Sequence, residues 1–478
     1  MRECLGNWVT ERKPIAGRIG GGKKTCLILV LILGAVGSLP LVILTPPFQA
    51  PDEVQHFYRA YQLSEFHLRA EVQNGKAGGT LPASLTQLVK MSVYTQDGVF
   101  YPATPAPIAK TLQLRSIPLD PSTRQFVAFP GSAFYSPLPY LPQVLGIAVG
   151  RGMGEGPLVL LYLGRLFNCL AALGLLGLAV KLMPFAEELV IVAGLLPMSL
   201  YLYASLSPDA AVIGCALVFS ALAIAAGARE KWGTGELWAA VAVAAVFCPV
   251  KPVYFPMLLM AAVPGVFRPG EAARMLRAHA ILLGTVLGVT VGWALYAKSS
   301  MTDPLSGAQP SLQLSLVLHH PVFFVGVLAH TLGLVRIALL YLQAVGIFGW
   351  LSVPLSPSVV YLLPLISFVI VWSLCNVGVI ERSTRRALWR LALALACTVL
   401  IVAIIYVMWA RVGQDYAEGV QGRYFIPILT LAGIALLELA PRRRTSSPRW
   451  QGLLGLAMIS VMEIAAMDAT IIRAFHVF

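Results

Sequence analysis

Long, uninterrupted runs of apolar residues limit the folds open to this chain. Residues 25–45, 157–180 and 391–409 are each long enough to cross the hydrocarbon core of a bilayer as a helix. Because no water is available there, backbone groups must bond within one helix or within a closed barrel. The runs are continuous rather than alternating, which selects helices. The sequence therefore predicts an all-α, polytopic transmembrane helical bundle.

Composition and charge agree with this class of protein. The 478 residues are 58% hydrophobic and 12% charged, whereas a soluble protein is about one quarter charged. A net charge of +13 would suggest nucleic acid in a soluble protein. Most Arg and Lys residues lie in short clusters between apolar runs, so we expect no nucleic-acid partner. The seven cysteines are scattered and show no metal-ligand spacing, which indicates small apolar fillers.

The basic clusters also predict an orientation. Residues 1–24 carry several cations and precede the first apolar run, so we expect an uncleaved anchor whose N-terminus is cytoplasmic. Placing every dense Arg/Lys cluster on the cytoplasmic side gives about eleven spans. The predicted spans are 25–45, 157–180, 187–206, 210–228, 236–249, 254–266, 280–297, 358–379, 391–409, 425–440 and 451–473.

Two long segments then lie outside the cell membrane, 46–156 and 298–357. Within the first, 134–149 is apolar but short, and counting it as a span would move all later basic clusters outside. We therefore expect a juxtamembrane helix there. In the second, we expect the apolar piece 323–348 to be interfacial or re-entrant, because Arg336 and Gln343 interrupt it. No repeat or linker is evident, so residues 1–478 are taken as a single transmembrane domain.

Two adjacent carboxylates, Asp52 and Glu53, follow a proline-rich stretch directly after the first span. The prolines end the helix and keep the chain extended. If 52–65 is helical, Asp52, His56 and Arg59 share one face. A solvated helix start with favourably placed acids is the alternative. Acids, His and Arg beside a membrane more often mark a functional site.

Asp209 and Lys251 are two further candidates, each between predicted spans. Asp209 ends the sequence Ser207-Pro208-Asp209, where an N-cap of the next helix is the alternative. Lys251 stands at the tip of a short hairpin, where a lysine reaching for the interface is the alternative. Since the hairpin is too short to extend far, Lys251 is expected at the floor of a cavity.

Arg423 lies at the outer membrane boundary in Gln421-Gly422-Arg423-Tyr424, away from the cytoplasmic clusters. The positive-inside rule disfavours that place, which indicates an anionic partner. A phosphate is a natural one, because guanidinium binds it through two hydrogen bonds. Pairing with Asp415 or Glu418 is the alternative.

Together these residues suit transfer from a phosphorylated lipid. A carboxylate can deprotonate an acceptor hydroxyl or hold a divalent metal. Cations can stabilise the departing phosphate as its charge develops. No P-loop and no strand–helix GxGxxG is present, so we expect no site for a soluble nucleotide sugar.

Four segments carry a resemblance to a known family. They are Pro47 to His56, Tyr135 to Tyr140, Ser207-Pro208-Asp209 and Gln421 to Phe425. The set resembles a bacterial family of predicted membrane proteins of unknown function, which in turn looks similar to the GT-C superfamily of polytopic glycosyltransferases. The resemblance covers most of the chain, and the Pro-Asp-Glu and Gly-Arg-Tyr-Phe segments are specific to the family.

The GT-C resemblance implies a polyprenyl-phosphate-linked sugar donor and an envelope glycan, lipid or protein as acceptor. It implies a multi-pass protein of the bacterial inner (cytoplasmic) membrane, with an extracytoplasmic active site. An acid of the first outer loop would be base or metal ligand, here Asp52 with Glu53, and Asp209 would be the second acid. The helix after Tyr135 would be juxtamembrane. No Asp-x-Asp motif is present, so a requirement for Mg²⁺ or Mn²⁺ stays open.

We therefore expect an integral membrane glycosyltransferase with a GT-C-like fold. Asp52 and Glu53 are the predicted catalytic residues, and both would be the ligands of any metal. The predicted phosphate contacts are Arg59, Lys251, Arg423 and Tyr424, and the further site residues are His56, Asp209, Tyr135 and Gln421. Two alternatives stay open: a transporter or flippase of a lipid-linked sugar, and a non-catalytic assembly partner. Transporters usually show repeats and ionisable groups near the midplane, and neither is evident here.

Overall fold

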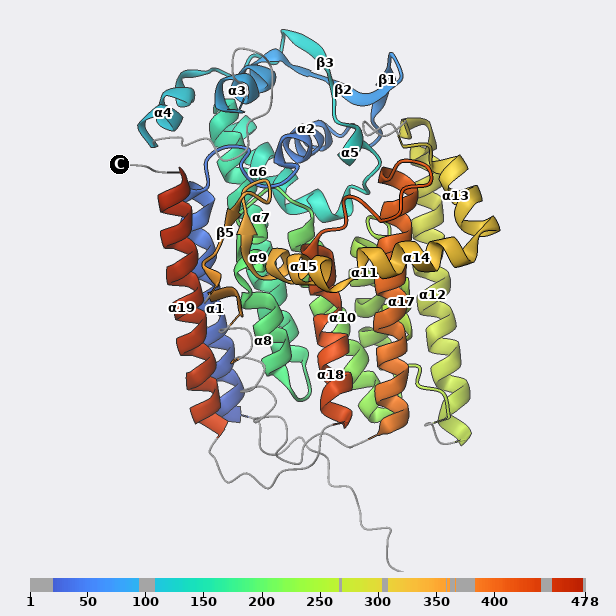
Figure 1. Cartoon of the computed structure of the whole chain (residues 1–478). Coiled ribbons are helices and arrows are strands. Elements are labelled where there is room, and N and C mark those ends of the chain that lie inside the picture. The colour runs from blue at the N-terminus through green and yellow to red at the C-terminus, as the bar shows by residue number, and fades with distance from the viewer. Residues whose placement is uncertain are drawn as a thin grey trace, which may run out of the picture.

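A computed structural model describes residues 20–93, 108–265, 269–302, 308–357, 359–361, 366, 383–439 and 449–475. Helices dominate these residues and run mostly parallel to one another below a smaller layer of mixed structure (Figure 1). The α-helices are α1 (Gly20–Leu44), α2 (Glu53–Ser64), α3 (Ala83–Val93), α4 (Ile108–Gln113), α5 (Pro130–Ala133), α6 (Leu141–Gly152), α7 (Pro157–Leu182), α8 (Glu187–Leu195), α9 (Pro197–Tyr203), α10 (Asp209–Arg229), α11 (Thr234–Phe247), α12 (Pro269–Ala297), α13 (Pro310–His319), α14 (Pro321–Thr331), α15 (Leu334–Gly346), α17 (Thr384–Trp409), α18 (Leu429–Leu439) and α19 (Arg449–Phe475). The 3-10 helices are η2 (Leu114–Ser116), η3 (Leu138–Tyr140), η4 (Pro252–Leu259), η5 (Lys298–Ser300) and η6 (Gly422–Ile428), and the strands are β1 (Glu71–Gln73), β2 (Lys76–Pro82), β3 (Arg124–Ala128), β4 (Ile347–Phe348) and β5 (Val353–Pro354).

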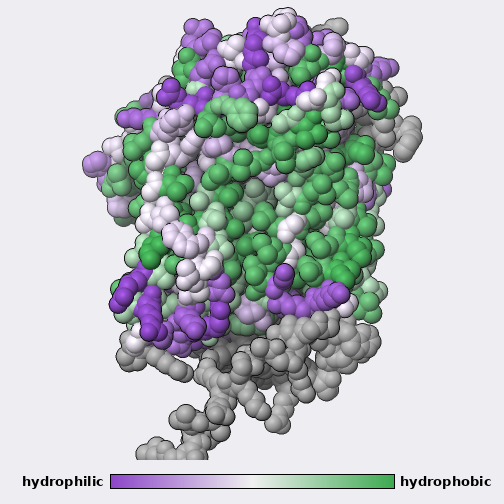
Figure 2. Space-filling model, turned by 180° about the vertical axis from the view of Figure 1, so that it is seen from behind, coloured by the Kyte–Doolittle hydropathy of each residue, from purple (hydrophilic) through white to green (hydrophobic). Residues whose placement is uncertain are grey.

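Seven helical segments among the described residues are long and apolar enough to cross a membrane. They are Lys23–Leu44, Pro157–Leu182, Asp209–Arg229, Gly270–Ser300, Thr384–Trp409, Gly422–Leu439 and Leu454–Phe475. Each contains or overlaps one of the predicted spans. Seen from behind, the bundle presents a broad hydrophobic belt between two hydrophilic ends, as expected of a protein that lies in lipid (Figure 2).

Three predicted spans are not single long helices. The span predicted at 187–206 is divided into α8 and α9, because Pro197 follows and Leu196 is extended, with ψ 139°. The span predicted at 236–249 is α11, which has only 14 residues. The span predicted at 254–266 begins as the 3-10 helix η4, in which Pro252 and Pro256 remove backbone donors. The span predicted at 358–379 lies almost wholly outside the described residues.

The central helix of the bundle is α10, whose residues are almost all buried. Small side chains allow its close approach to α7: a Cβ on Gly214 would lie 2.8 Å from the Leu175 side chain. Such small-residue contacts drive helix association in membranes, where burial of apolar surface contributes little. Asp209 is the first residue of α10. Its position is therefore fixed by a helix that is buried along almost its whole length.

The prediction of an all-α chain is incomplete, because residues 46–93 and 108–156 include a small sheet. We call these residues the loop layer. Its strands pair antiparallel in the order β1-β2-β3, with Gly78 opposite Ala128 and Thr80 opposite Phe126. Phe57, Tyr61, Leu85 and other apolar residues form a hydrophobic core for this layer. The layer therefore sits on one end of the bundle with packing of its own (Figure 1).

The juxtamembrane helix predicted at 134–149 corresponds to η3 and α6. α6 has 12 residues and so is about 18 Å long, well short of the hydrocarbon thickness. It packs closely on α7, where a Cβ on Gly146 would lie 2.4 Å from the Leu163 carbonyl oxygen. α6 is therefore too short to cross the hydrocarbon core as a single helix, and the juxtamembrane placement stays a prediction.

The apolar piece predicted at 323–348 also avoids a straight crossing. The piece begins within α14, which is bent by 108° from the preceding α13, and it continues as the separate helix α15. α14 and α15 lie across the direction of the long helices (Figure 1). Arg336 of α15 places its guanidinium 3.6 Å from the centre of the Tyr416 ring. A helix in this orientation fits the expectation of an interfacial or re-entrant segment.

Candidate functional site

The segment between α1 and α2 turns tightly and presents Asp52 at the start of α2. Phe48 and Asp52 both have left-handed backbone conformations, with φ 65° and 60°. Trp350 donates its indole N–H to the Phe48 carbonyl at 3.0 Å, and Tyr201 donates to the Gln49 carbonyl at 3.0 Å. A strained backbone persists only where its surroundings fix it, and this one is held from two distant parts of the chain.

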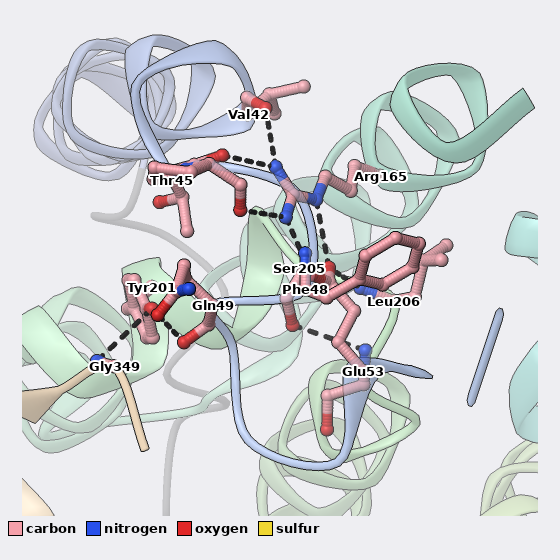
Figure 3. A network of polar contacts seen from close by, with 12 residues as sticks. Val42, Thr45, Phe48, Gln49, Glu53, Arg165, Tyr201, Ser205, Leu206 and Gly349 are labelled. Carbon is pink, nitrogen blue, oxygen red and sulfur yellow. Dashed lines mark hydrogen bonds and ion pairs between the residues drawn. The ribbon is translucent and has the colours of Figure 1, made fainter. Parts of the chain in front are cut away.

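Beneath this turn, Glu53 and Arg165 form a fully buried ion pair (Figure 3). Arg165 donates to both Glu53 carboxylate oxygens, at 2.8 and 2.6 Å. The same two oxygens accept the Phe48 N–H at 3.0 Å and the Leu206 N–H at 3.1 Å. Glu53 is therefore saturated by structural contacts, and the geometry does not support the predicted catalytic or metal-binding role.

The sequence argument missed Arg165, which completes this network. Its remaining donors bind the carbonyl oxygens of Val42, Thr45 and Pro46 at 3.1, 2.6 and 3.0 Å. The signal was present, because Arg165 is an isolated cation within an apolar span, where charged residues are costly and usually paired. Arg165 thus joins the end of α1 to α7 and fixes the backbone that carries Asp52.

Four charged residues far apart in sequence meet at the end of the bundle that carries the loop layer: Asp52, Asp209, Lys251 and Arg423. Arg423 donates to Asp52 Oδ2 at 2.9 Å, and its Nε lies 3.4 Å from Asp209 Oδ2. Lys251 donates to Asp209 Oδ1. The side chain of Asp52 is 42% exposed, whereas that of Arg423 is 5% exposed. We call these four residues the charged cluster; Asp52 is its most accessible member.

Asp209 is placed by contacts around its turn. Asn168 of α7 donates to the carbonyl oxygens of Ser205 and Ser207 at 2.7 and 3.2 Å. Pro208 is the N-cap of α10, and the Asp209 N–H donates to the Ser207 hydroxyl oxygen at 3.2 Å. The capping alternative therefore does not describe Asp209, whose carboxylate instead meets Lys251 and Arg423.

Lys251 and Arg423 share Tyr424 as a neighbour. The Lys251 ammonium lies 4.3 Å from the centre of the Tyr424 ring, and the Arg423 guanidinium carbon lies 5.5 Å from it. Tyr254 donates to the Tyr424 carbonyl at 2.7 Å and so fixes this segment. The alternative pairing of Arg423 with Asp415 is not observed, because Asp415 contacts His330 at 3.1 Å. Glu418 accepts from Gln414.

Three buried polar atoms in or beside the charged cluster lack well-directed hydrogen bonds among the described residues. They are Nε and Nη1 of Arg423 and Oε1 of Gln421, and of these Nε lies 3.4 Å from Asp209 Oδ2. The Tyr424 side chain is close enough to Arg423 for an electrostatic interaction but does not provide a well-aligned acceptor for Nη1. Leaving a buried charged donor unpaired costs free energy, so these groups suit a ligand that offers acceptors and donors here.

Gly422 is required where η6 crosses α15. A Cβ at this position would lie 1.9 Å from the Leu340 carbonyl oxygen and 2.4 Å from the Ala344 nitrogen. The Gly422 N–H also donates to Gln343 Oε1 at 2.9 Å. The transverse helix α15 therefore supports the backbone that positions Arg423.

Replacing Gly422 with alanine is expected to lower the free energy of unfolding by about 1–3 kcal/mol, since both clashing atoms belong to the backbone. The measurement is thermal unfolding of the purified protein in detergent. Gly288→Ala on α12 is the matched control, because a Cβ there meets nothing within 4 Å. Equal midpoints for the two variants would contradict the proposed close packing of η6 on α15.

His56 lies one helical turn after Asp52 and is buried against two tyrosines. Its Nδ1 shares a 2.8 Å hydrogen bond with the Tyr140 hydroxyl, and the Tyr135 ring stacks on it at 6.2 Å. Burial lowers the pKa of His56 from 6.5 to about 4, and Asp52 opposes that shift without overcoming it. Burial likewise raises the pKa of both tyrosines. His56 is therefore neutral at pH 7.

This lowered pKa predicts a stability that falls in acid. The unfolded state binds a proton on His56 below about pH 6.5, whereas the folded state does so only near pH 4. Stability contributed by neutral His56 is therefore lost as the pH falls from 6.5 toward 4. Thermal midpoints across this range should drop less for His56→Gln than for the parent. An unchanged pH dependence would show that His56 does not titrate this way; the exposed His320 provides the control, His320→Gln.

Arg59 is part of the loop layer's framework rather than of the charged cluster. It donates to Gln62 Oε1 at 2.6 Å and to the carbonyl oxygens of Leu68 and Tyr135 at 2.7 and 3.1 Å. Burial lowers the pKa of Arg59 to about 10, which leaves it charged at pH 7. Of the predicted face of Asp52, His56 and Arg59, only Asp52 belongs to the charged cluster, and His56 follows it by one helical turn. The geometry does not support Arg59 as a phosphate contact.

A divalent metal does not fit the two adjacent carboxylates. Asp52 binds Arg423, whereas both oxygens of Glu53 bind Arg165, so the pair does not converge on one point. Within the described part of the chain, no three His, Cys, Asp or Glu side chains are grouped to hold a metal ion.

The helical belt and its buried charged cluster define a polytopic α-helical membrane protein. Residues 36–432 match the family of predicted membrane proteins called DUF2142. Because the match covers most of the chain, the protein belongs to this family. No curated protein and no solved structure matches the chain.

Proposed function

We propose that this protein is an integral membrane glycosyltransferase that moves a sugar from a polyprenyl phosphate to a cell-envelope acceptor. The supporting observation is the charged cluster, which joins one accessible carboxylate to buried cations at the end of a membrane bundle. A lipid-linked donor reaches such a site from the bilayer, and a hydrophilic acceptor reaches it from the loop layer. The GT-C resemblance implied by the sequence points to the same reaction.

In the proposed reaction, Asp52 removes the proton of an acceptor hydroxyl. The acceptor oxygen forms a bond to the anomeric carbon as the bond from that carbon to the phosphate oxygen breaks. The electron pair leaves with the polyprenyl phosphate, which gains one negative charge. Arg423 and Lys251 stabilise that charge as it develops, from positions already fixed by Asp209 and Tyr424.

Charge balance gives the donor a second role. The two carboxylates and two cations of the charged cluster cancel one another. An arriving phosphate therefore competes with Asp52 for Arg423, whose Nη1 has no well-directed acceptor. Once the phosphate holds the guanidinium, the Asp52 carboxylate is released to act as base. Donor binding thus activates the catalytic acid–base group.

The proposal includes the cellular arrangement. We place the protein in the bacterial cytoplasmic membrane, with a cytoplasmic N-terminus, a GT-C-like bundle of about eleven spans and an extracytoplasmic loop layer. In this arrangement α8 and α9 together form one span, and α11 and the segment that begins with η4 form one span each. They are counted as spans because the chain must return across the membrane there, not because of their length. The positive-inside distribution of Arg and Lys supports this orientation.

The test is a transfer assay with the purified protein in lipid. A panel of radiolabelled polyprenyl-phosphate sugars is supplied with envelope extract as acceptor. We expect one donor to pass its label to the acceptor, with an equal amount of free polyprenyl phosphate. Failure of every donor, with protein shown to be folded by a sharp thermal transition, would overturn the proposal in favour of transport or assembly.

A further inference from the structure

A polar pocket of about 590 Å³ opens on the loop layer, at the C-terminal end of α2. The charged cluster lies at the opposite, N-terminal end of the same helix. α2 has 12 residues, which separates the two places by about 18 Å. No step of the proposed reaction uses this pocket.

Phe66 stands beside this pocket in a conformation that normally requires glycine. The Phe66 N–H bonds to the Leu63 carbonyl at 2.9 Å, and the His67 N–H bonds to the Gln62 carbonyl at 3.2 Å. These two bonds are those of a Schellman motif, in which the left-handed residue is usually glycine. Phe66 takes that position with φ 61°, although a bulky side chain is disfavoured there.

The Phe66 ring is 88% exposed, so its burial does not compensate for the strained backbone. A strained residue that holds a large apolar side chain in solvent suits contact with a ligand. The Schellman hydrogen bonds fix the Phe66 backbone, and the side chain is short, so the ring has little freedom to move away from the pocket. The pocket therefore has one apolar wall of defined position.

The polar walls consist of a tightly paired network. Glu65 accepts from Arg124 at 3.1 and 2.6 Å and contacts Arg151 at 3.3 Å. Thr80 donates to Glu71 at 2.7 Å. Two guanidiniums thus face two carboxylates, and the pocket carries no net charge from these four groups.

This pairing selects the class of ligand. An anion would have to compete with Glu65 for the two guanidiniums, and a cation would have to compete with them for the carboxylate. A neutral polyol needs neither, because its hydroxyls both donate and accept. A pyranose or furanose ring also has an apolar face for Phe66. We propose that the pocket binds a neutral saccharide unit.

The inference rests on the proposed function where it concerns catalysis, because it then names the acceptor as a neutral glycan. The distance of about 18 Å between the pocket and the charged cluster is one that a chain of a few sugar units would span. The binding site itself is independent of that reaction, and the experiment separates the two.

The test measures binding of fluorescently labelled oligosaccharides to the full-length Asp52→Asn protein in lipid nanodiscs, where no transfer can consume them. The panel contains neutral hexose oligosaccharides and matched oligosaccharides that carry carboxylates or phosphate. We expect a neutral member to bind, insensitively to salt. No binding by any neutral member, or tighter binding by the charged set, would overturn the inference.

Phe66→Gly is the decisive variant because glycine relieves the strain while it removes the ring. Binding should weaken about tenfold, the loss of one aromatic contact, while the thermal midpoint stays at or above that of the parent. Leu112→Ala on α4, which removes another exposed apolar side chain (60%), should leave binding unchanged. Undiminished binding by Phe66→Gly would remove the proposed site.

The outcomes for the two proposals are distinguishable. Oligosaccharide binding that depends on Phe66, from a wild-type protein that transfers no sugar, keeps the pocket and removes the transferase. Transfer of sugar by a protein that binds no neutral oligosaccharide keeps the transferase and removes the pocket.

Discussion

Asp52→Asn is expected to reduce sugar transfer by about 10²–10⁴-fold, the usual contribution of a positioned general base. Asparagine keeps the size of the side chain and still offers an oxygen to Arg423, but it cannot take a proton. Because the Asp52 side chain is 42% exposed, the thermal midpoint should change little. The measurement is initial rate of label transfer at saturating donor, with the thermal midpoint recorded on the same preparation.

Asp415→Asn provides the matched control. Asp415 lies on the same side of the bundle, in a pair with His330 whose side chains are both 67% exposed. It should transfer at the wild-type rate. Full activity of Asp52→Asn would remove Asp52 from the mechanism, and equal loss in both variants would show a general sensitivity to charge rather than a catalytic group.

Arg165→Met is expected to be the most destabilising of the substitutions considered. It leaves the Glu53 carboxylate buried without its cation, which costs about 3–5 kcal/mol when one partner of a buried pair is removed. It also removes donors from the carbonyl oxygens of Val42, Thr45 and Pro46. The expected result is a large drop in thermal midpoint and in the yield of folded protein.

A double-mutant cycle isolates the ion pair from the other contacts of Arg165. Glu53→Gln should be milder, because the amide oxygen still accepts a hydrogen bond. In Glu53→Gln with Arg165→Met, no uncompensated charge remains, so the double variant should be more stable than Arg165→Met alone. If the double variant is the less stable of the two, the buried charge is not the cause of the loss.

The sequence predicts the bundle well because long apolar runs have few structural options in lipid. It fails where the backbone departs from a straight helix. Pro197 and Pro256 lie within predicted spans and interrupt them, although their neighbours are apolar enough for continuous helices. The strands β1 and β2 escaped notice because Lys76 to Pro82 is short and contains two glycines, without an alternating pattern.

The candidate site divides along similar lines. Asp52, Asp209, Lys251 and Arg423 were chosen for their place at membrane boundaries, and the structure brings all four together. Glu53 is a carboxylate like Asp52, but its side chain points to Arg165 rather than to Arg423. The direction of a side chain cannot be predicted from the residue type alone. Arg165 is absent from the predicted site because it lies within a span rather than between spans, although its isolation among apolar residues is itself an informative signal.

The pairing pattern of the charged cluster has a consequence for how the protein is made. Asp209 and Lys251 are 42 positions apart, whereas Asp52 and Arg423 are 371 apart. During synthesis, Lys251 emerges soon after Asp209, so this pair neutralises its two charges while later helices are still absent. Asp52 stands at the membrane without its cation until translation has reached Arg423. A product that stops before Arg423 therefore carries one acid of the charged cluster without its partner.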